Sequence, residues 1–153
     1  MSVRNFAPES FSEYDNILAI LHDACKSCNA TSFESITGGY RMIFKDTHSW
    51  FLKNSWKTEL YLNYNFAGVI YRIHLKSTLL GFRKSYNDKY KYSIKLNNVN
   101  EKIDFGAFYL DITGETIYRM GIDFHKDEYL SVNAIKDWIE TSNYYIDKYF
   151  ETL

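Results

Sequence analysis

Two closely spaced cysteines are the residues of this sequence best suited to redox or metal chemistry. Cys25 and Cys28 form a Cys-x-x-Cys motif in "CKSC", and His22 precedes them. A redox pair normally sits at a helix N-terminus, where the helix dipole lowers a thiol pKa, whereas these cysteines end the first predicted helix. A structural zinc site needs four ligands, and the chain has no second cysteine pair. We therefore expect ordinary thiols, with no metal site and no cofactor.

A second group of chemically capable side chains lies in "FYLDITGETIYRMGIDF", residues 108–124. Asp111, Glu115 and Arg119 combine carboxylates and a guanidinium, as an acid–base site would. The alternation of apolar residues around them instead predicts a β-hairpin. In that interpretation Asp111 opens a type I turn and Gly114 takes the left-handed bulge position. Both residues then have a structural role.

The length of the loop decides which residues of this hairpin face each other. A two-residue loop would set Leu110 beside Ile117, which mixes the two faces of the hairpin. A three-residue loop pairs Leu110 with Thr116 and Phe108 with Tyr118, so that apolar side chains share one face. The pattern therefore predicts the three-residue loop and places the charged residues on the polar face or in the turn.

Histidines give no further catalytic motif. They are scattered over different predicted elements, and none lies in an HExxH or nucleophile-elbow sequence: His22, His48, His74 and His125. An active site assembled from distant residues stays open as an alternative. The expectation is a protein without enzyme activity or catalytic residues.

A basic, tyrosine-rich segment, "FRKSYNDKYKYSIK" at 82–95, is the strongest candidate for a binding surface. Lysines interleaved with aromatic rings suit a single-stranded nucleic acid. The sequence pI of about 6.4 and the acidic C-terminal third argue against that ligand. We expect a surface for a protein partner or a second copy of the chain, formed by Tyr86, Tyr90, Lys89, Lys91 and Lys95.

The elements that position these residues follow from periodicity. A capping-box pattern at Ser10 and Glu13 and helical spacing of apolar residues predict a helix at roughly 11–28. Alternating apolar residues predict three half-buried strands before residue 80, in "GGYRMIFK", "KTELYLNYN" and "GVIYRIHLK". Ser131 caps a last amphipathic helix with the apolar stripe Ile135, Trp138, Ile139, Ser142, Ile146, Tyr149 and Phe150.

The segment around residues 84–98 has two interpretations. "KYKYSIKL" alternates with period two, which favours a strand. As a helix, the segment would turn one face inward, formed by Tyr86, Tyr90, Ile94 and Asn97 and flanked by Leu96 and Val99. Periodicity alone favours the strand.

Composition indicates one soluble globular domain over 1–153. The chain is 46 % hydrophobic and 24 % charged and has a single proline. Its start lacks a signal-peptide core, and its longest apolar run, "FAGVIY", is too short to span a membrane, so we expect a cytoplasmic protein. The net charge of −1 is divided unevenly, with +6 in residues 70–100 and −6 in residues 101–153. These segments could neutralise each other within one fold or across a dimer, or present opposite faces to partners.

The C-terminal half resembles a known family. The run "KLNNVNEKIDFGAFYLDITGETIYRMGIDF", followed by "LSVNAIKDWIETSNYYIDKYFETL", is similar to the YbjN family, bacterial proteins with the fold of type III secretion chaperones. The corresponding features are an Asn ending a helix (Asn97 or Asn100), Gly106 and Phe108 at the start of a strand, and the Asp-x-x-Gly hairpin. The resemblance implies the element order α-βββ-α-ββ-α and therefore a helix at 84–98. We follow it there and predict an α+β fold with a five-stranded antiparallel sheet packed against the first and last helices.

The resemblance also implies a function. Its members look like small, often dimeric, non-enzymatic binding or regulatory proteins, so we expect a chaperone-like or regulatory protein that binds a protein partner and forms a homodimer. The 18 % aromatic content supports self-association, because tyrosine and phenylalanine are frequent at interfaces. Alternatives are an immunity-type protein or secretion chaperone with one dedicated partner, and, against the pI, a nucleic-acid binder. The near-neutral net charge departs from the acidity typical of dedicated secretion chaperones.

Overall fold

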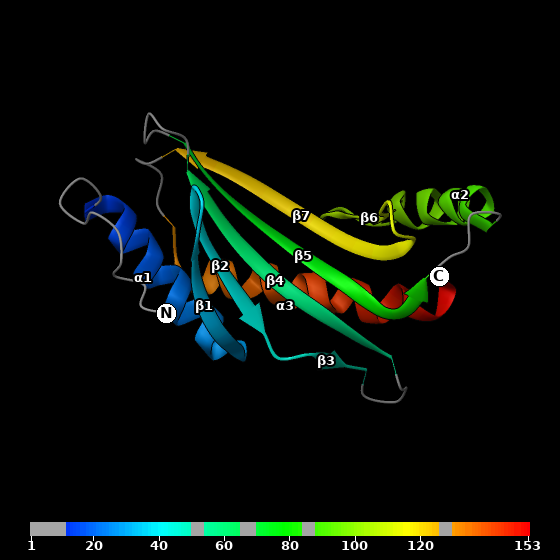
Figure 1. The fold of residues 1–153 in the computed structure, drawn as a ribbon, viewed down its shortest axis with the longest axis horizontal. Coiled ribbons are helices and arrows are strands. Elements are labelled where there is room, and N and C mark those ends of the chain that lie inside the picture. Colours follow the sequence, from blue (N-terminus) through cyan, green and yellow to red (C-terminus); the bar gives the residue numbers. More distant parts are fainter. Residues whose placement is uncertain (1–11, 50–53, 65–69, 84–87, 126–129) are drawn as a thin grey trace.

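The computed structural model describes residues 12–49, 54–64, 70–83, 88–125 and 130–153 (Figure 1). It contains three α-helices and seven strands within these residues. In chain order they are α1 (Ser12–Ser27), β1 (Ala30–Ile36), β2 (Gly39–Phe44), β3 (Thr47–His48), β4 (Ser55–Tyr64), β5 (Ile70–Arg83), α2 (Lys89–Asn100), β6 (Ala107–Leu110), β7 (Glu115–His125), α3 (Val132–Tyr149) and a short 3₁₀ turn, η2 (Phe150–Thr152). The predicted cap at Ser10 lies outside the described residues.

The strands form one antiparallel sheet in the order β1-β2-β4-β5-β7-β6, with the short β3 paired to β4. The predicted α+β class and the order of helices are confirmed, but the sheet has seven strands instead of five. β1 was missed because "ATSFESI" carries few apolar residues, as suits an edge strand that is only half covered. β3 is a two-residue bridge, too short to leave a periodic pattern.

One face of the sheet carries the hydrophobic core. Alternate residues of the central strands point to this face and are buried: Tyr40, Met42 and Phe44 on β2, Trp56, Leu60 and Leu62 on β4, Tyr71, Ile73, Leu75 and Leu79 on β5, and Tyr118, Met120 and Phe124 on β7. Buried hydroxyls are paired there, because Thr58 Oγ1 lies 2.7 Å from Ser77 Oγ. The strand faces predicted from alternation are confirmed.

Helices α1 and α3 cover the core face and contact each other (Figure 1). Ser131 caps α3 by accepting a hydrogen bond from the Ala134 amide at 3.0 Å, as predicted. The predicted stripe of α3 is buried or half-buried, and Trp56 Nε1 donates to Asn143 Oδ1 at 2.9 Å, tying α3 to β4. The opposite face of the sheet carries many charged side chains, including Arg41, Glu59, Arg72 and Arg119, together with the buried Ile117. Among the described residues, no helix has the length and apolarity needed to cross a membrane.

The hairpin of β6 and β7 confirms the sequence-based register. Leu110 pairs with Thr116 and Phe108 with Tyr118. Gly114 adopts a left-handed backbone with φ of 88°. The Asp111 carboxylate accepts hydrogen bonds from the backbone N–H groups of Thr113 and Glu115 and from the Thr113 hydroxyl, which fixes the turn.

Residues 89–100 are a helix, so the element implied by the family resemblance is confirmed and the strand favoured by periodicity is wrong. The centre of the inward face predicted for this helix is also wrong, although its flanking residues Leu96 and Val99 are buried as predicted and Tyr86 lies outside the described residues. Tyr90, Ile94 and Asn97 are exposed, whereas the buried side chains are Tyr92, Leu96 and Val99. The alternation of lysine and tyrosine gives almost no apolar stripe, so tertiary contacts decide which face is buried.

Candidate interaction surfaces

Helix α2 is held against the end of the sheet by two sets of side-chain hydrogen bonds. The Tyr92 hydroxyl lies 2.7 Å from Thr116 Oγ1 on β7. Asn100 donates through Nδ2 to the Phe108 carbonyl at 2.8 Å and accepts from the Phe108 N–H at 2.7 Å. The asparagine expected from the family pattern is therefore Asn100, and its amide occupies the place that a neighbouring strand would take beside β6.

The opposite side of α2 presents apolar and basic side chains to solvent. We call Tyr90, Lys91, Ile94 and Lys95 the outer face of α2. Tyr90 is 78 % exposed and Ile94 47 %, and both lysines are exposed. Lys89 is half-buried, and its ammonium lies 3.5 Å from the Ile112 carbonyl at the tip of the hairpin. The structure thus brings together three of the predicted surface residues, Tyr90, Lys91 and Lys95, whereas Lys89 contacts the hairpin instead. Tyr86 lies outside the described residues.

The face of the sheet opposite α1 and α3, which we call the helix-free face, carries further basic residues of the 70–100 segment. Arg72, His74 and Lys76 of β5 point to this face, whereas Lys91 and Lys95 project from α2. The lysines and arginines named here are therefore divided between two surfaces. Lys76 stands directly across from Arg119 of β7, an arrangement of like charges that is unfavourable in a sheet. Arg72 makes a bidentate pair with Asp123, at 2.6 and 2.9 Å.

His74 is held neutral among these cations. Burial, together with the positive charges of Arg119, Arg72 and Lys76, lowers its pKa to about 4. Its ring stacks on Tyr61 with the centroids 4.6 Å apart. The basic character of this face at neutral pH therefore comes from the arginines and Lys76.

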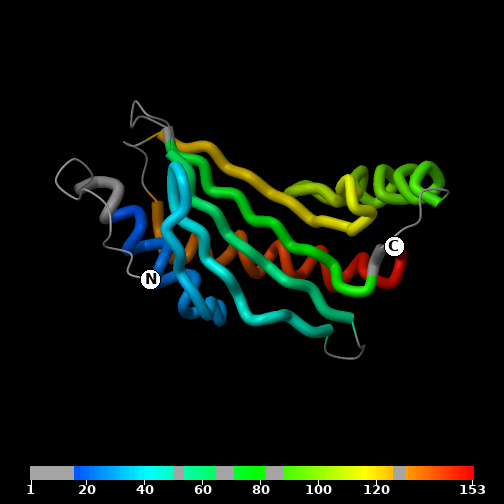
Figure 2. The backbone as a smooth tube through the Cα atoms, in the orientation of Figure 1, coloured from blue at the N-terminus to red at the C-terminus, as the bar shows by residue number. Residues whose placement is uncertain are grey.

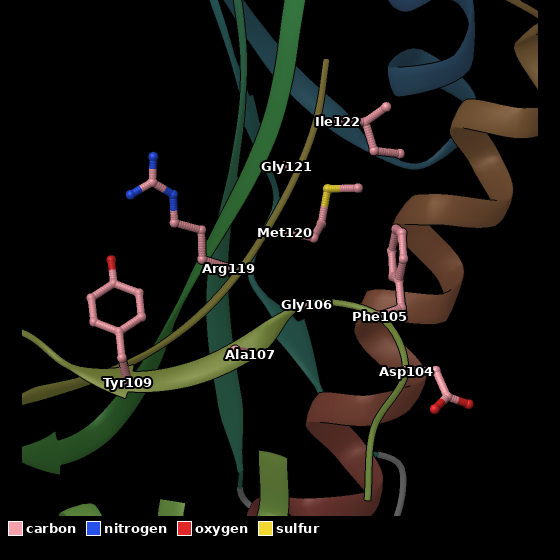
Figure 3. A pocket seen from close by; sticks show the side chains of 9 residues that line it. All are labelled: Asp104, Phe105, Gly106, Ala107, Tyr109, Arg119, Met120, Gly121 and Ile122. Carbon is pink, nitrogen blue, oxygen red and sulfur yellow. The ribbon is translucent and has the colours of Figure 1, made fainter. Parts of the chain in front are cut away.

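A depression of about 680 Å³ lies where β6 begins (Figure 3). Its walls come from the chain entering β6 and from the middle of β7. Phe105, Met120 and Ile122 point to the core side of the sheet, whereas Tyr109 and Arg119 point to the helix-free side. Gly106 and Gly121 leave the space between these walls open. The sequence-based interpretation missed this site, although the predicted hairpin already had a longer strand after its turn than before it.

The two cysteines stay apart from these surfaces. Both are free thiols on or beside α1, with Cys25 buried in the core and Cys28 half-buried. Burial and the neighbouring Cys28 raise the pKa of the Cys25 thiol, which opposes thiolate chemistry. Within the residues that the structure describes, no group of three or more His, Cys, Asp or Glu side chains could hold a metal ion.

Comparison with known proteins agrees with this architecture. Residues 85–153, which contain α2, β6, β7 and α3, match the model of the YbjN family, described as "Putative bacterial sensory transduction regulator". The resemblance predicted from the Asp-x-x-Gly hairpin and the terminal helix is thereby confirmed over this part of the chain. No curated protein matches the sequence.

Proposed function

We propose that this YbjN-family chain, matched to the family over residues 85–153, is a non-enzymatic regulatory protein that acts by binding other protein chains. The observation that supports it most is the outer face of α2. Large apolar side chains, Tyr90 and Ile94, are exposed on a helix whose other side is anchored to the sheet by Tyr92 and Asn100. A fixed helix with an exposed aromatic anchor is a common form of protein-binding surface. The regulatory role rests on the family description.

We further propose that one occupant of this face is a second copy of the chain. The exposed side of α3 offers a complement to the lysines of α2, with Asp137, Glu140 and Asp147 exposed around a 59 % exposed Tyr144. In a two-fold pair, α2 of each copy would lie on α3 of the other, so that both contacts are made twice. Opposite charges beside exposed aromatic rings favour this pairing.

Sedimentation equilibrium tests the pairing. We expect the wild-type protein to have twice the 18.1 kDa mass of the chain at tens of micromolar and moderate salt. Tyr90→Ala and Lys95→Glu should return it to a monomer, whereas Lys57→Glu, a matched reversal of an exposed lysine on β4, should not. A monomeric wild type contradicts the pairing, and a dimer that survives Tyr90→Ala places the interface elsewhere.

A fluorescent single-stranded oligonucleotide tests the competing class of ligand. Nucleic-acid binding would weaken steeply with salt and would fall when Lys89, Lys91 and Lys95 are neutralised. Tight binding with both properties would contradict the proposal that the partner is a protein.

A further inference from the structure

The outer edge of β7 is only partly paired. β7 runs from Glu115 to His125, but β6 pairs with it only from Thr116 to Arg119. Beyond Arg119, no strand among the described residues lies on this side of β7, which forms the outer border of the sheet (Figure 2). We call residues 120–125 the open edge of β7.

The hydrogen-bonding phase of β7 shows which backbone groups face this edge. Asp111 donates its N–H to the Glu115 carbonyl across the hairpin, so Glu115 directs its backbone polar groups toward β6. In an antiparallel strand this direction alternates, so odd-numbered residues point to the β6 side and even-numbered residues bond β5. Gly121 and Asp123 therefore direct their N–H and C=O groups to the open edge, where an added strand could bond them.

The chain leaves this edge because of Gly106. Gly106 has a φ of 77°, and a Cβ atom there would collide with the Tyr118 hydroxyl and the Arg119 carbonyl. Tyr118 also donates its hydroxyl hydrogen to the Phe105 carbonyl, which holds the incoming chain to one side. After this left-handed residue, β6 starts at Ala107. The position beside Gly121 and Asp123, where a longer β6 would lie, is therefore not occupied by any strand of the described chain.

The depression described above lies along this unoccupied stretch beside β7, and its two walls differ in chemical character (Figure 3). The core-side wall is apolar, since it consists of Phe105, Met120 and Ile122. The other wall belongs to the helix-free face, where Arg119 and Lys76 stand side by side as like charges and Asp123 is already paired to Arg72. An occupant with apolar side chains on one side and acidic side chains on the other matches both walls.

We propose that the open edge of β7 binds an extended segment of a partner protein in which apolar and acidic residues alternate. The segment runs antiparallel to β7, in line with β6, and extends the sheet by β-strand addition. Residues opposite Gly121 and Asp123 bond the edge and point their side chains to the helix-free face. An acidic residue opposite Gly121 lies next to Arg119, and one opposite Asp123 meets a carboxylate that Arg72 already pairs. The apolar positions point to Phe105, Met120 and Ile122. β1, the other border of the sheet, is a poorer acceptor, because its register shifts between Ala30 and Ser32 and such bulges disfavour added strands.

A fluorescein-labelled peptide of about eight residues that alternates Val and Glu is the probe, measured by fluorescence anisotropy against the full chain. We expect saturable binding of this peptide. A peptide that alternates Val and Lys should bind with an affinity at least about tenfold lower. N-methylation tests the hydrogen bonding. Methyl groups on the Glu amides, which face β7, should weaken binding about tenfold or more, whereas methyl groups on the Val amides should leave it unchanged.

Variants of Gly121 test the same contact from the protein side. Gly121→Pro removes the N–H that faces the open edge and leaves the hydrogen bonds to β5, which even-numbered residues make, so proline is tolerable there. We expect about tenfold weaker binding. Gly121→Ala is the matched control, because its Cβ would lie 3.6 Å from His74 Cβ, an ordinary contact, and the N–H is kept. Circular dichroism melting checks that both variants fold. If Gly121→Pro does not fold, the methylated peptides still decide whether the edge of β7 makes the hydrogen bonds.

This inference rests on the proposed function in one respect, that the protein binds other protein chains. The experiments can nevertheless fail separately. Equal binding of the two methylated peptides, or no binding of the Val–Glu peptide, overturns the β7 proposal and leaves the α2 face unaffected. Conversely, Tyr90→Ala should abolish self-association and leave peptide affinity unchanged. If Gly121→Pro instead splits a wild-type dimer, the edge pairs with a second copy, and the proposal of a separate partner segment is wrong.

Discussion

Replacing Asn100 tests whether one side chain holds α2 to the sheet. Its amide makes two hydrogen bonds to the backbone of Phe108, at 2.8 and 2.7 Å, in a half-buried setting. Each such bond contributes about 0.5–1.5 kcal/mol, so Asn100→Ala should lower the free energy of unfolding by about 1–3 kcal/mol. Urea unfolding, followed by far-ultraviolet circular dichroism, measures the loss.

Asn98→Ala is the matched control, because Asn98 is exposed on the same helix and alanine favours both helix positions. The difference between the two variants isolates the contact with Phe108. Asn100→Asp adds a test of geometry, since a carboxylate can accept from the Phe108 N–H but opposes the Phe108 carbonyl. Asn100→Asp should therefore also lower the free energy of unfolding at neutral pH, because only one of the two hydrogen bonds can be kept. A difference between the alanine variants below about 0.5 kcal/mol would refute the proposed role of Asn100.

Three further predictions concern the sheet and its turns. The pKa of His74 is lowered to about 4 in the folded protein, so as the pH falls the unfolded chain binds a proton at this residue before the folded chain does. The free energy of unfolding should therefore fall as the pH drops from 6.5 toward 4. Urea titrations at a series of pH values should show a smaller fall over this range for His74→Gln. Burial alone would raise the pKa of Asp111, but hydrogen bonds from Thr113 and Glu115 outweigh it and lower that pKa, so the stabilisation by Asp111 is present at neutral pH and lost in acid below about 4. Asp111→Ala should lose about 1–2 kcal/mol at pH 7 and progressively less as the pH falls below about 4, as measured by thermal melts. Gly106→Ala should destabilise by about 1–3 kcal/mol more than Gly81→Ala in urea unfolding, because both glycines have a left-handed backbone but only at Gly106 would a Cβ collide with its surroundings.

Features encoded by neighbouring residues could be predicted from the sequence. The Asp-x-x-Gly turn specified a loop length, which in turn fixed the register of Phe108 against Tyr118. Ser131 and the apolar stripe behind it specified α3 in the same local way. The inward face of α2 could not be predicted, because its lysine–tyrosine alternation has no preferred side and the contact of Tyr92 with Thr116 joins residues far apart in sequence.

The candidate surfaces followed the same division. The exposed position of Tyr90 and its neighbouring lysines could be proposed from composition, although the same pattern placed Tyr90 on the wrong side of the helix. The open edge of β7 depends on where β6 starts, and that start depends on the close approach of Gly106, with its left-handed backbone, to Tyr118. A contact between residues this far apart in the chain cannot be predicted from a local sequence pattern.

The strand order has a consequence for how the protein is made on the ribosome. Along β1-β2-β4-β5 the neighbours in space follow one another closely in the chain, but β7 joins β5 only after α2 and β6 have been synthesised. The free border of β5 therefore stays unpaired until β7 has been synthesised. The apolar side of α1 likewise stays uncovered until α3 has been synthesised, because α1 packs against α3. Long-range closure of this kind slows folding and leaves strand borders exposed during synthesis. The segment matched to the family, residues 85–153, completes a sheet that earlier residues begin, so a fragment cut at residue 85 would separate β7 from its longest pairing.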